Sequence, residues 1–149
     1  MILFYIDYSI QNMKVSTSIQ VVCALIFRSD QKLLIVQRNN EQSNGYLWEF
    51  PGGKIEAGES ESECLHRELK EELNLSVSIH HKFCTVFKKS EGLDLELMAY
   101  ICKPLHTDFE LLEHLDHHWL DIHSMMTRVL CPADYQILTK LRIRSTKSV

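Results

Sequence analysis

The strongest constraint on the fold is one helical segment set between stretches with strand character. Leu65, Leu69 and Leu73 recur at every fourth residue, a spacing that places them on one face of an α-helix. Ser60, followed three residues later by Glu63, forms a capping box that marks the start of this helix. The pattern predicts a helix from Ser60 to Leu73 whose apolar face packs against another element.

Apolar stretches on both sides of this helix indicate β-strands. Residues 19–27 and 32–37 are nearly continuous apolar runs separated by a short polar segment, which predicts a hairpin of two buried strands. Three later strands and a final helix are predicted at 75–79, 83–88, 93–102 and 133–143. This order predicts one mixed α+β domain in which helices pack on the faces of a sheet.

Length and composition fit a single domain. The 149 residues are 45% hydrophobic and 24% charged, values that exclude collagen-like, low-complexity and disordered chains. We expect the domain to span residues 15–143, between an extension at 1–14 and a flexible tail at 144–149. The extension is apolar but contains Asp7 and no basic leading region. It is interpreted as an extra edge strand, or as a segment translated ahead of a native start near Met13, rather than a signal peptide.

Charge and cysteine content narrow the setting in which the chain works. The formal net charge is −4, so the chain lacks the broad basic surface expected of a protein with a stable nucleic-acid partner. The five cysteines form no Cys-x-x-Cys pair and no zinc spacing, which indicates reduced thiols and a cytoplasmic location. No apolar run reaches the roughly 18 residues of a membrane span. We expect no membrane association, and either a monomer or a homodimer.

Three carboxylates share one side of the predicted helix. Glu68, Glu71 and Glu72 stand at positions i, i+3 and i+4. The pair Gly52 and Gly53 lies upstream, where the absence of side chains lets main-chain carbonyls approach an ion. Carboxylate and carbonyl oxygens are the ligands that Mg2+ and Mn2+ prefer. The alternative interpretation is a solvated acidic helix face.

A longer pattern favours the metal site. Residues 53–75 contain the fixed positions Gly53, Glu59, Arg67-Glu68-Leu69, Glu71-Glu72 and Asn74-Leu75. These positions are separated in turn by five, seven, one and one residues. This spacing resembles the Nudix box, which has a second glycine where this chain has Asn74. That position follows a helix end in the left-handed region, where Asn is the best substitute for Gly. We therefore expect a small cost in stability and intact chemistry.

The resemblance continues outside the box, over residues 18–141, to MutT-like nucleoside triphosphate pyrophosphohydrolases. The matching features are the segment Leu47-Trp48-Glu49-Phe50-Pro51-Gly52-Gly53-Lys54, Arg38 at the end of the preceding strand, Glu113 six residues before Trp119, and Pro132-Ala133-Asp134. The resemblance implies the Nudix fold, a mixed β-sheet sandwiched between α-helices. It also implies metal-dependent hydrolysis of a nucleoside diphosphate linked to another group.

The resemblance also implies a role for each matching residue. The metal ligands it implies, for Mg2+ or alternatively Mn2+, are Gly52, Gly53, Glu68, Glu71, Glu72 and Glu113. The catalytic residues it implies are Arg67, Glu68, Glu71 and Glu113, with Glu68 or Glu113 as the base. Arg67 would orient Glu68 and keep it ionised among like charges, and Glu59 is the first acid of the motif, without a sharper role. For Glu113 the alternative is an ordinary surface glutamate.

Substrate contacts follow from the flanking matches. Arg38 and Lys54 are the expected phosphate-binding cations, against the alternative of surface residues. Asp134 is the expected base-binding residue, where relatives that act on 8-oxo-dGTP often carry asparagine. An ionised carboxylate only accepts hydrogen bonds, so Asp134 favours an exocyclic amino group such as N4 of cytosine. Its alternative role is a helix N-cap before Tyr135.

The expected reaction is attack of water at the β-phosphorus of a (deoxy)nucleoside triphosphate. It releases the monophosphate and pyrophosphate, with a preference for cytosine or modified nucleotides that suits sanitation of the nucleotide pool. The alternatives are an 8-oxo-dGTP diphosphatase, an enzyme for another nucleoside diphosphate derivative, and a nucleotide-binding module without catalysis. A silent module would be expected to lack a box acid, and every one is present.

Three further signals are not assigned a function. Candidates for stacking on the base are Phe83, Phe87 and Tyr100, although aromatic strand residues usually belong to the core. The histidines near Trp119, interpreted as a polar loop rather than a zinc site, are His114, His117, His118 and His123. The basic residues Arg142, Arg144 and Lys147 are interpreted as a frayed terminus rather than an RNA contact.

Overall fold

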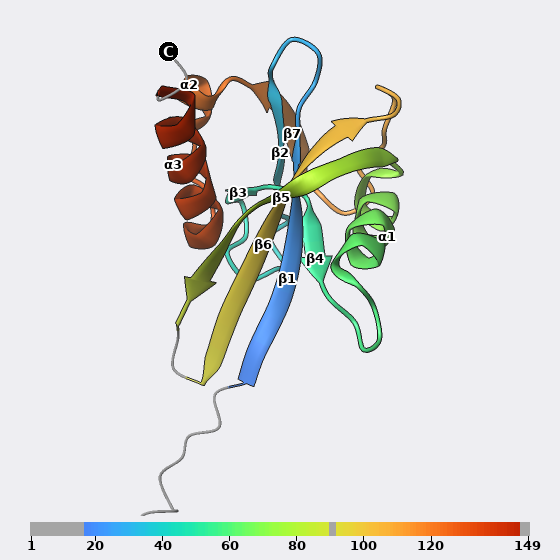
Figure 1. The fold of residues 1–149 in the computed structure, drawn as a ribbon, viewed down its shortest axis with the longest axis vertical. Helices are drawn as coiled ribbons and strands as arrows, with labels where there is room; N and C mark the ends of the chain where they lie inside the picture. The colour runs from blue at the N-terminus through green and yellow to red at the C-terminus, as the bar shows by residue number, and fades with distance from the viewer. Residues whose placement is uncertain (1–16, 90–91, 147–149) are drawn as a thin grey trace, which may run out of the picture.

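The computed structural model describes residues 17–89 and 92–146. The extension expected at 1–14 and residues 147–149 of the expected tail lie outside these ranges. The elements in chain order (Figure 1) are β1 (Thr17–Ile26), β2 (Leu33–Gln37), β3 (Trp48–Glu49), β4 (Gly52–Lys54), α1 (Glu61–Leu73), β5 (Val77–Lys88), β6 (Leu93–Pro104), β7 (Asp116–Leu120), α2 (Ile122–Met125) and α3 (Pro132–Thr146).

The strands form two sheets that lie between the two long helices. One sheet has the order β4-β1-β6-β5, and the other has the order β3-β2-β7. Strand β1 runs parallel to β6, with Val21 opposite Leu97, and antiparallel to β4. Helices α1 and α3 lie on opposite sides of these strands (Figure 1). This mixed sheet between helices confirms the predicted α+β sandwich.

Strand β1 supplies side chains to both halves of the core. Val22, Ala24 and Ile26 pack in one apolar cluster with the leucines of α1. Cys23 and Leu25 belong to the other cluster, together with the apolar residues of α3. Because neighbouring residues of a strand point to opposite faces, burial on both faces explains why residues 19–27 are almost continuously apolar.

The predicted hairpin of residues 19–27 and 32–37 is wrong. Strands β1 and β2 belong to different sheets, and β2 pairs with β3 and β7 instead. The turn is present, since Phe27 forms an isolated antiparallel bridge with Leu33, but the two strands separate beyond it. A strand that is apolar on both faces carries no alternation to specify its partner, so sequence order was a poor guide to pairing here.

Both ends of α1 form as the sequence predicts. The Ser60 hydroxyl accepts a hydrogen bond from the Glu63 N–H at 3.3 Å, and the Glu63 carboxylate accepts one from the Ser60 N–H at 2.9 Å. Asn74 closes the helix in the left-handed conformation, with φ 48° and ψ 34°. The asparagine that departs from the Nudix box therefore adopts the backbone conformation for which glycine is favoured.

Other boundaries differ from the prediction in detail. The strands predicted at 75–79 and 83–88 are one strand, β5, with irregular register between Ile79 and His81 and between Lys82 and Cys84. Helix α3 includes residues 144–146, which were expected to belong to the tail. All five cysteines are free thiols. Among the helices of the described chain, none has the length and apolar character needed to cross a membrane.

Candidate active site

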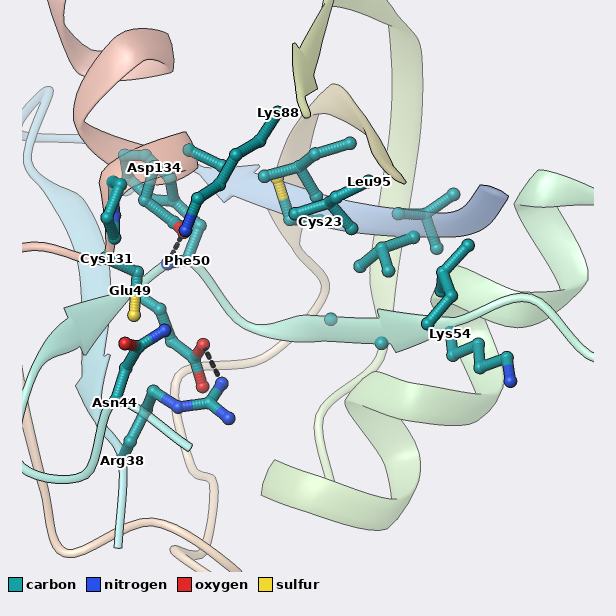
Figure 2. Close-up of a pocket in the computed structure, with 18 of the residues that line it drawn as sticks. Cys23, Arg38, Asn44, Glu49, Phe50, Lys54, Lys88, Leu95, Cys131 and Asp134 are labelled. Carbon is teal, nitrogen blue, oxygen red and sulfur yellow. Dashed lines mark hydrogen bonds and ion pairs between the residues drawn. The ribbon is translucent and has the colours of Figure 1, made fainter. Parts of the chain in front are cut away.

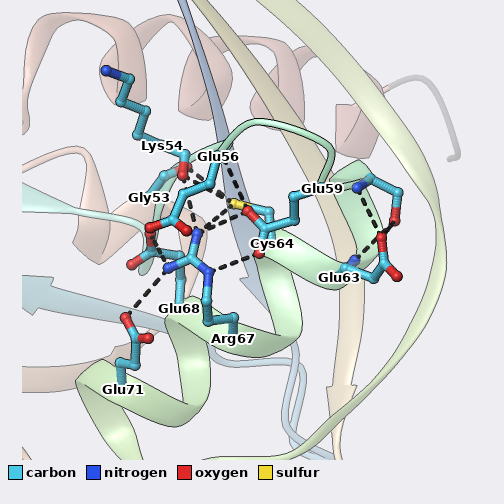
Figure 3. A network of polar contacts seen from close by, with 10 residues as sticks. Gly53, Lys54, Glu56, Glu59, Glu63, Cys64, Arg67, Glu68 and Glu71 are labelled. Atoms are coloured by element: carbon cyan, nitrogen blue, oxygen red, sulfur yellow. Dashed lines mark hydrogen bonds and ion pairs between the residues drawn. The ribbon is translucent and has the colours of Figure 1, made fainter.

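Arg67 on α1 is the centre of a polar network that includes most of the predicted motif (Figure 3). Its Nε and Nη2 donate to the two carboxylate oxygens of Glu59, at 2.7 and 2.9 Å. Its Nη1 donates to Glu68 at 2.8 Å, and its Nη2 also donates to the Lys54 carbonyl at 3.1 Å. The guanidinium thus fastens the loop before α1 to the helix, and gives Glu59 the defined role that the sequence did not supply.

Glu71 lies at the edge of this network. Its carboxylate is 3.3 Å from Arg67 Nη1, and its side chain is 53% exposed. The Glu68 side chain, by comparison, is only 15% exposed. Glu71 therefore offers carboxylate oxygens to solvent beside a more buried Glu68.

The two glycines of β4 are required by close packing. A Cβ on Gly53 would lie 2.2 Å from the Glu68 carboxyl carbon, and a Cβ on Gly52 would lie 2.1 Å from the Val22 carbonyl oxygen. The Gly52 N–H donates to Glu72 at 3.2 Å. Because no side chain intervenes, the backbone of β4 lies directly against the carboxylates of α1.

Negative charge is concentrated where these acids meet. Glu72 is 7% exposed, and its pKa is raised to about 9 by burial and by the charges of Glu49 and Glu68. Burial also raises the pKa of Glu68, whereas the hydrogen bond and the positive charge of Arg67 act to lower it. The Glu113 charge raises both pKa values, which places this loop glutamate close to the α1 acids.

The donor set fits a hard divalent cation. Carboxylate oxygens and the backbone of two glycines lie side by side, and a bound cation would offset the burial and mutual repulsion that raise the pKa values of Glu68 and Glu72. Within residues 17–89 and 92–146, no three His, Cys, Asp or Glu side chains already converge as a metal centre.

A cavity of about 330 Å3 lies beside this acidic group. Figure 2 shows its lining, which joins β4 to the start of α3. Of the predicted site residues, it contains Arg38, Gly52, Gly53, Lys54 and Asp134. The structure therefore brings the predicted phosphate-binding, metal-binding and base-binding residues to one place, although Arg67 and the α1 glutamates do not line this cavity.

Asp134 forms part of the cavity wall near α3. It is 6% exposed and accepts a hydrogen bond from the Phe50 N–H at 2.8 Å. Burial and the charge of Glu49 raise its pKa to about 7. Helix α3 begins at Pro132, so Asp134 lies inside the first turn, and the alternative of an N-cap before Tyr135 is wrong.

The two predicted phosphate-binding cations differ in their surroundings. The Arg38 guanidinium donates to the Glu49 carboxylate and to the Ser43 carbonyl, so it is partly buried and held in place. The Lys54 side chain is exposed and extends away from the α3 end of the cavity (Figure 2). Lys88, which the sequence did not single out, also lines the cavity.

Sequence reasoning assigned no role to Glu49 and His114. Glu49 pairs with Arg38 and also lies 3.1 Å from His114 Nε2. His114 lies in the loop before β7, as predicted, but its side chain is only 1% exposed. The polar-loop interpretation is wrong for the other three histidines, since β7 contains His117 and His118 and α2 contains His123. No signal in the sequence identified Glu49, because neighbouring residues of a strand point to opposite faces, and a carboxylate between Trp48 and Phe50 equally fits an exposed face.

Fold and site together define a class of protein. A mixed sheet between helices, with carboxylates of α1 beside the glycines of β4 and a cavity beyond them, is the arrangement of a Nudix hydrolase. The model of the NUDIX domain matches residues 17–141, and the chain belongs to this family. It is an enzyme of the MutT-like group with pyrophosphohydrolase activity.

Several proteins of known name or structure are similar to the chain. A CTP pyrophosphohydrolase of Escherichia coli is 33% identical over 120 residues, which cover 80% of this chain and 88% of that protein. An 8-oxo-dGTP diphosphatase of Proteus vulgaris is 35% identical over 60 residues, 40% of this chain and 54% of that protein. The solution structure of the E. coli ORF135 protein matches with a TM-score of 0.76 and 31% identity over 85% of this chain and 90% of that one.

A fourth comparison supports the fold alone. The MutT protein of Methanosarcina mazei matches with a TM-score of 0.78 and 23% identity, over 89% of this chain and 98% of that one. The Nudix architecture is thus shared across the chain and is not confined to the box.

Proposed function

We propose that the protein hydrolyses nucleoside triphosphates to the monophosphate and pyrophosphate with Mg2+, and that it favours cytosine or modified-cytosine nucleotides. The observation that carries this proposal is the cavity, which connects the β4 glycines beside the α1 carboxylates to the buried acceptor Asp134. One end suits a metal-bound phosphate chain, and the other suits a base.

The metal would be held by Glu68, Glu71 and Glu72, with a carbonyl of Gly52 or Gly53 and with Glu113 as further ligands. When bound, a divalent cation neutralises phosphate oxygens and lowers the pKa of its water, so that hydroxide forms near neutral pH. Mn2+ has similar ligand preferences and is expected to substitute.

The chain's own residues position this chemistry. Arg67 holds Glu68 at 2.8 Å, and the bare backbone of Gly53 leaves room for the Glu68 carboxylate. Arg38 and Lys54 supply positive charge for the phosphate oxygens. The base that removes a proton from the attacking water is Glu68 or Glu113. These two side chains lie near each other, since the Glu113 charge raises the pKa of Glu68.

Base preference is assigned to Asp134. As a carboxylate it accepts hydrogen bonds and retains acceptor capacity beyond the one used by the Phe50 N–H, which suits the N4 amino group of cytosine. The name of the E. coli relative, a CTP pyrophosphohydrolase, supports this choice.

A second candidate substrate is 8-oxo-dGTP. The pKa of Asp134 near 7 leaves part of the population protonated at neutral pH, and a protonated carboxyl can donate as well as accept. The 8-oxo-dGTP diphosphatase relative supports this alternative.

A panel of nucleotides with Mg2+ tests both candidates. We expect a higher kcat/KM for CTP, dCTP or their C5-modified forms than for unmodified purine nucleotides, with release of pyrophosphate. Replacement of Asp134 with Ala should reduce this preference, and unchanged selectivity would remove Asp134 from the base site.

The metal assignment is tested separately. Glu71→Gln should abolish turnover and leave the folded structure unchanged, because Glu71 is exposed and its amide analogue has the same shape. Glu96→Gln, in β6, is the matched control with an equal loss of charge. Binding of a nucleotide without any hydrolysis by the wild type would favour the silent module instead.

A further inference from the structure

His114 is a buried polar side chain to which the proposed hydrolysis assigns no role. Its side chain is 1% exposed, and its Nε2 lies 3.1 Å from Glu49 Oε1. The other ring nitrogen, Nδ1, is buried without a hydrogen-bond partner among the residues that the structure describes. Because burial of an unpaired polar atom costs stability, an apolar side chain would fill this place at a lower cost. Packing alone therefore does not explain a histidine at this position.

The segment that contains His114 lies against the segment that contains Arg38. On one side of His114, the Leu115 N–H donates to the Gln37 carbonyl at 2.9 Å. On the other side, the Asn39 side-chain amide donates to the carbonyl of the preceding loop residue at 3.2 Å. These contacts continue the antiparallel pairing of β2 with β7 beyond the end of both strands. The histidine is thus fixed opposite the residue that carries the expected phosphate-binding guanidinium.

Glu49 on β3 connects these two side chains. Its Oε2 accepts a hydrogen bond from Arg38 Nη1, and its Oε1 contacts His114 Nε2. A carboxylate has only acceptor sites, so the histidine ring donates from Nε2. The last torsion of a glutamate side chain is broad when it is unrestrained. One donor on each oxygen therefore fixes the plane of the Glu49 carboxylate.

Arg38 retains donors for a ligand. Its Nε donates to the Ser43 carbonyl at 2.9 Å, and its Nη1 donates to Glu49. A guanidinium has five N–H donors in one rigid plane, so these contacts set the direction of the plane and leave the Nη2 amino group unused by the described residues. Arg38 and Glu49 both line the cavity beside the acidic group (Figure 2). The direction of the guanidinium in this cavity therefore depends on where Glu49 is held.

We propose that His114 is a positioning residue for nucleotide binding, which holds the Glu49 carboxylate so that Glu49 orients Arg38 toward the phosphate chain. The inference rests on the proposed function, because it takes Arg38 as a phosphate contact. His114 itself touches neither the substrate nor a metal. Its effect reaches the cavity through two consecutive hydrogen bonds, both of which end on Glu49.

The alternative explanation is that His114 anchors the loop and thereby places its neighbour Glu113, an expected metal ligand. The two explanations predict different losses. A misdirected Arg38 weakens binding of the phosphate chain, which is already present in the ground state. A misplaced Glu113 slows the chemical step and leaves substrate binding unchanged.

The test is a titration of the full-length protein in Mg2+ with the α,β-methylene analogue of CTP, followed by amide chemical shifts. A CH2 group replaces the bridging oxygen in this analogue, so the bond that the enzyme would break is absent. His114→Leu should raise the Kd of the analogue by about tenfold, as expected for loss of one hydrogen bond to a charged group. The Kd of cytidine, which has no phosphate, should be unchanged.

Two further variants control for the size and burial of the side chain. His114→Gln keeps an amide donor near the position of Nε2, so the Kd of the analogue should stay within about twofold of the wild type. His117→Leu is the matched control, because His117 in β7 also has a buried and unpaired Nδ1. This variant lacks only the contact with Glu49, and it should change neither Kd.

Glu49→Gln identifies the route by which His114 acts. In this background, His114→Leu should raise the Kd of the analogue by no more than about twofold, because the orientation of Arg38 is already lost. The Tm of His114→Leu should equal or exceed that of the wild type, since the substitution removes an unpaired buried nitrogen. Weaker binding then cannot result from loss of the folded state.

Four results would overturn the inference. The first is an unchanged Kd of the analogue in His114→Leu. The second is equal weakening for cytidine, or by His117→Leu, which would indicate a general effect on the fold. The third is the full tenfold effect of His114→Leu in the Glu49→Gln background. The fourth is a lower kcat for CTP with an unchanged Kd of the analogue, which would assign His114 to the placement of Glu113.

The same measurements separate this inference from the proposed function. A wild type that binds the analogue and does not hydrolyse CTP would refute the proposed function alone, because the titration does not require turnover. A wild type that hydrolyses CTP, with an unchanged Kd of the analogue in His114→Leu, would refute the role of His114 alone. Absence of binding to the wild type would refute both.

Discussion

Among single residues, Arg67 connects separate parts of the motif. It contacts Glu59 with two donors, holds Glu68, and reaches the Lys54 carbonyl. A planar guanidinium makes such forked contacts, and an ammonium group cannot. The position therefore depends on the shape of the side chain as well as on its charge.

Replacement of Arg67 with Lys tests this dependence. The charge is retained but the fork to Glu59 is lost, so we expect kcat to fall by at least about tenfold. Steady-state hydrolysis of CTP measures the effect, and Arg142→Lys is the control with the same substitution outside the network. Wild-type kcat in Arg67→Lys would show that charge alone is sufficient.

Asp134 provides a prediction about pH. Its folded-state pKa of about 7 lies above its unfolded value, so the folded protein binds the proton more tightly than the unfolded chain does. The free energy of unfolding therefore falls as pH rises from about 4 to about 7, and this contribution becomes constant above that range.

Asp134→Asn removes this titration and keeps a side-chain oxygen for the Phe50 N–H. We expect the variant to match the wild type near pH 4 and to be more stable by on the order of 1–3 kcal/mol near pH 8. Urea unfolding at both pH values measures the difference. A constant difference across this range would contradict the raised pKa.

Residues in the motif could be predicted from the sequence because each is fixed by spacing along one helix and its preceding loop. Glu49 and His114 could not, since they meet across a long sequence separation through the pairing of β2 with both β3 and β7. Lys88 reaches the cavity for a similar reason, from the far edge of the other sheet. Such residues require the tertiary structure.

At the scale of elements, the C-terminal end of α1 depends on a left-handed residue. Asn74 adopts φ 48°, and its side chain donates to Glu110 at 3.1 Å. Alanine, which has a β-carbon but no amide group, would adopt this conformation at a higher cost in free energy. It would also lose the hydrogen bond to Glu110.

Asn74→Ala is therefore expected to destabilise the protein by about 1–2 kcal/mol. Asn74→Gly, which restores the residue of the family motif, should remain within about 0.5 kcal/mol of the wild type. Thermal unfolding of both variants measures the effect, with hydrolysis as a second readout that we expect to be unchanged. Equal stability of the Ala and Gly variants would contradict a role for the left-handed conformation.

The position of a helix could be predicted from the sequence, whereas the pairing of the strands could not. Helix α1 was located from its cap and leucine spacing because both signals are local. The pairing of β1 with β6 could not be predicted in this way. Both strands are buried by helices or neighbouring strands, and any apolar strand would fit the hydrophobic pattern of β1 equally well as a partner. The local period specifies the type of element, whereas the partner of each strand depends on contacts that form only in the folded molecule.

For the whole molecule, the buried acids predict a dependence of stability on a bound cation. Glu72 is buried near Glu49 and Glu68, so Mg2+ that binds the folded state should raise Tm. Glu72→Gln should reduce this increase, and excess EDTA should remove it. Differential scanning calorimetry with and without Mg2+ measures the effect, and an equal response in Glu72→Gln would exclude this residue as a ligand.

The central position of β1 has a consequence for synthesis. This strand is the first described element of the chain, yet its neighbours in the sheet are β4 and β6, and β6 ends at Pro104. Because a ribosome releases the chain from its N-terminus, this largely apolar strand emerges long before its parallel neighbour exists. During that interval its backbone hydrogen-bonding groups are satisfied by water or by a chaperone. The interval in which β1 lacks its parallel neighbour thus lasts until β6, which ends at Pro104, has been synthesised.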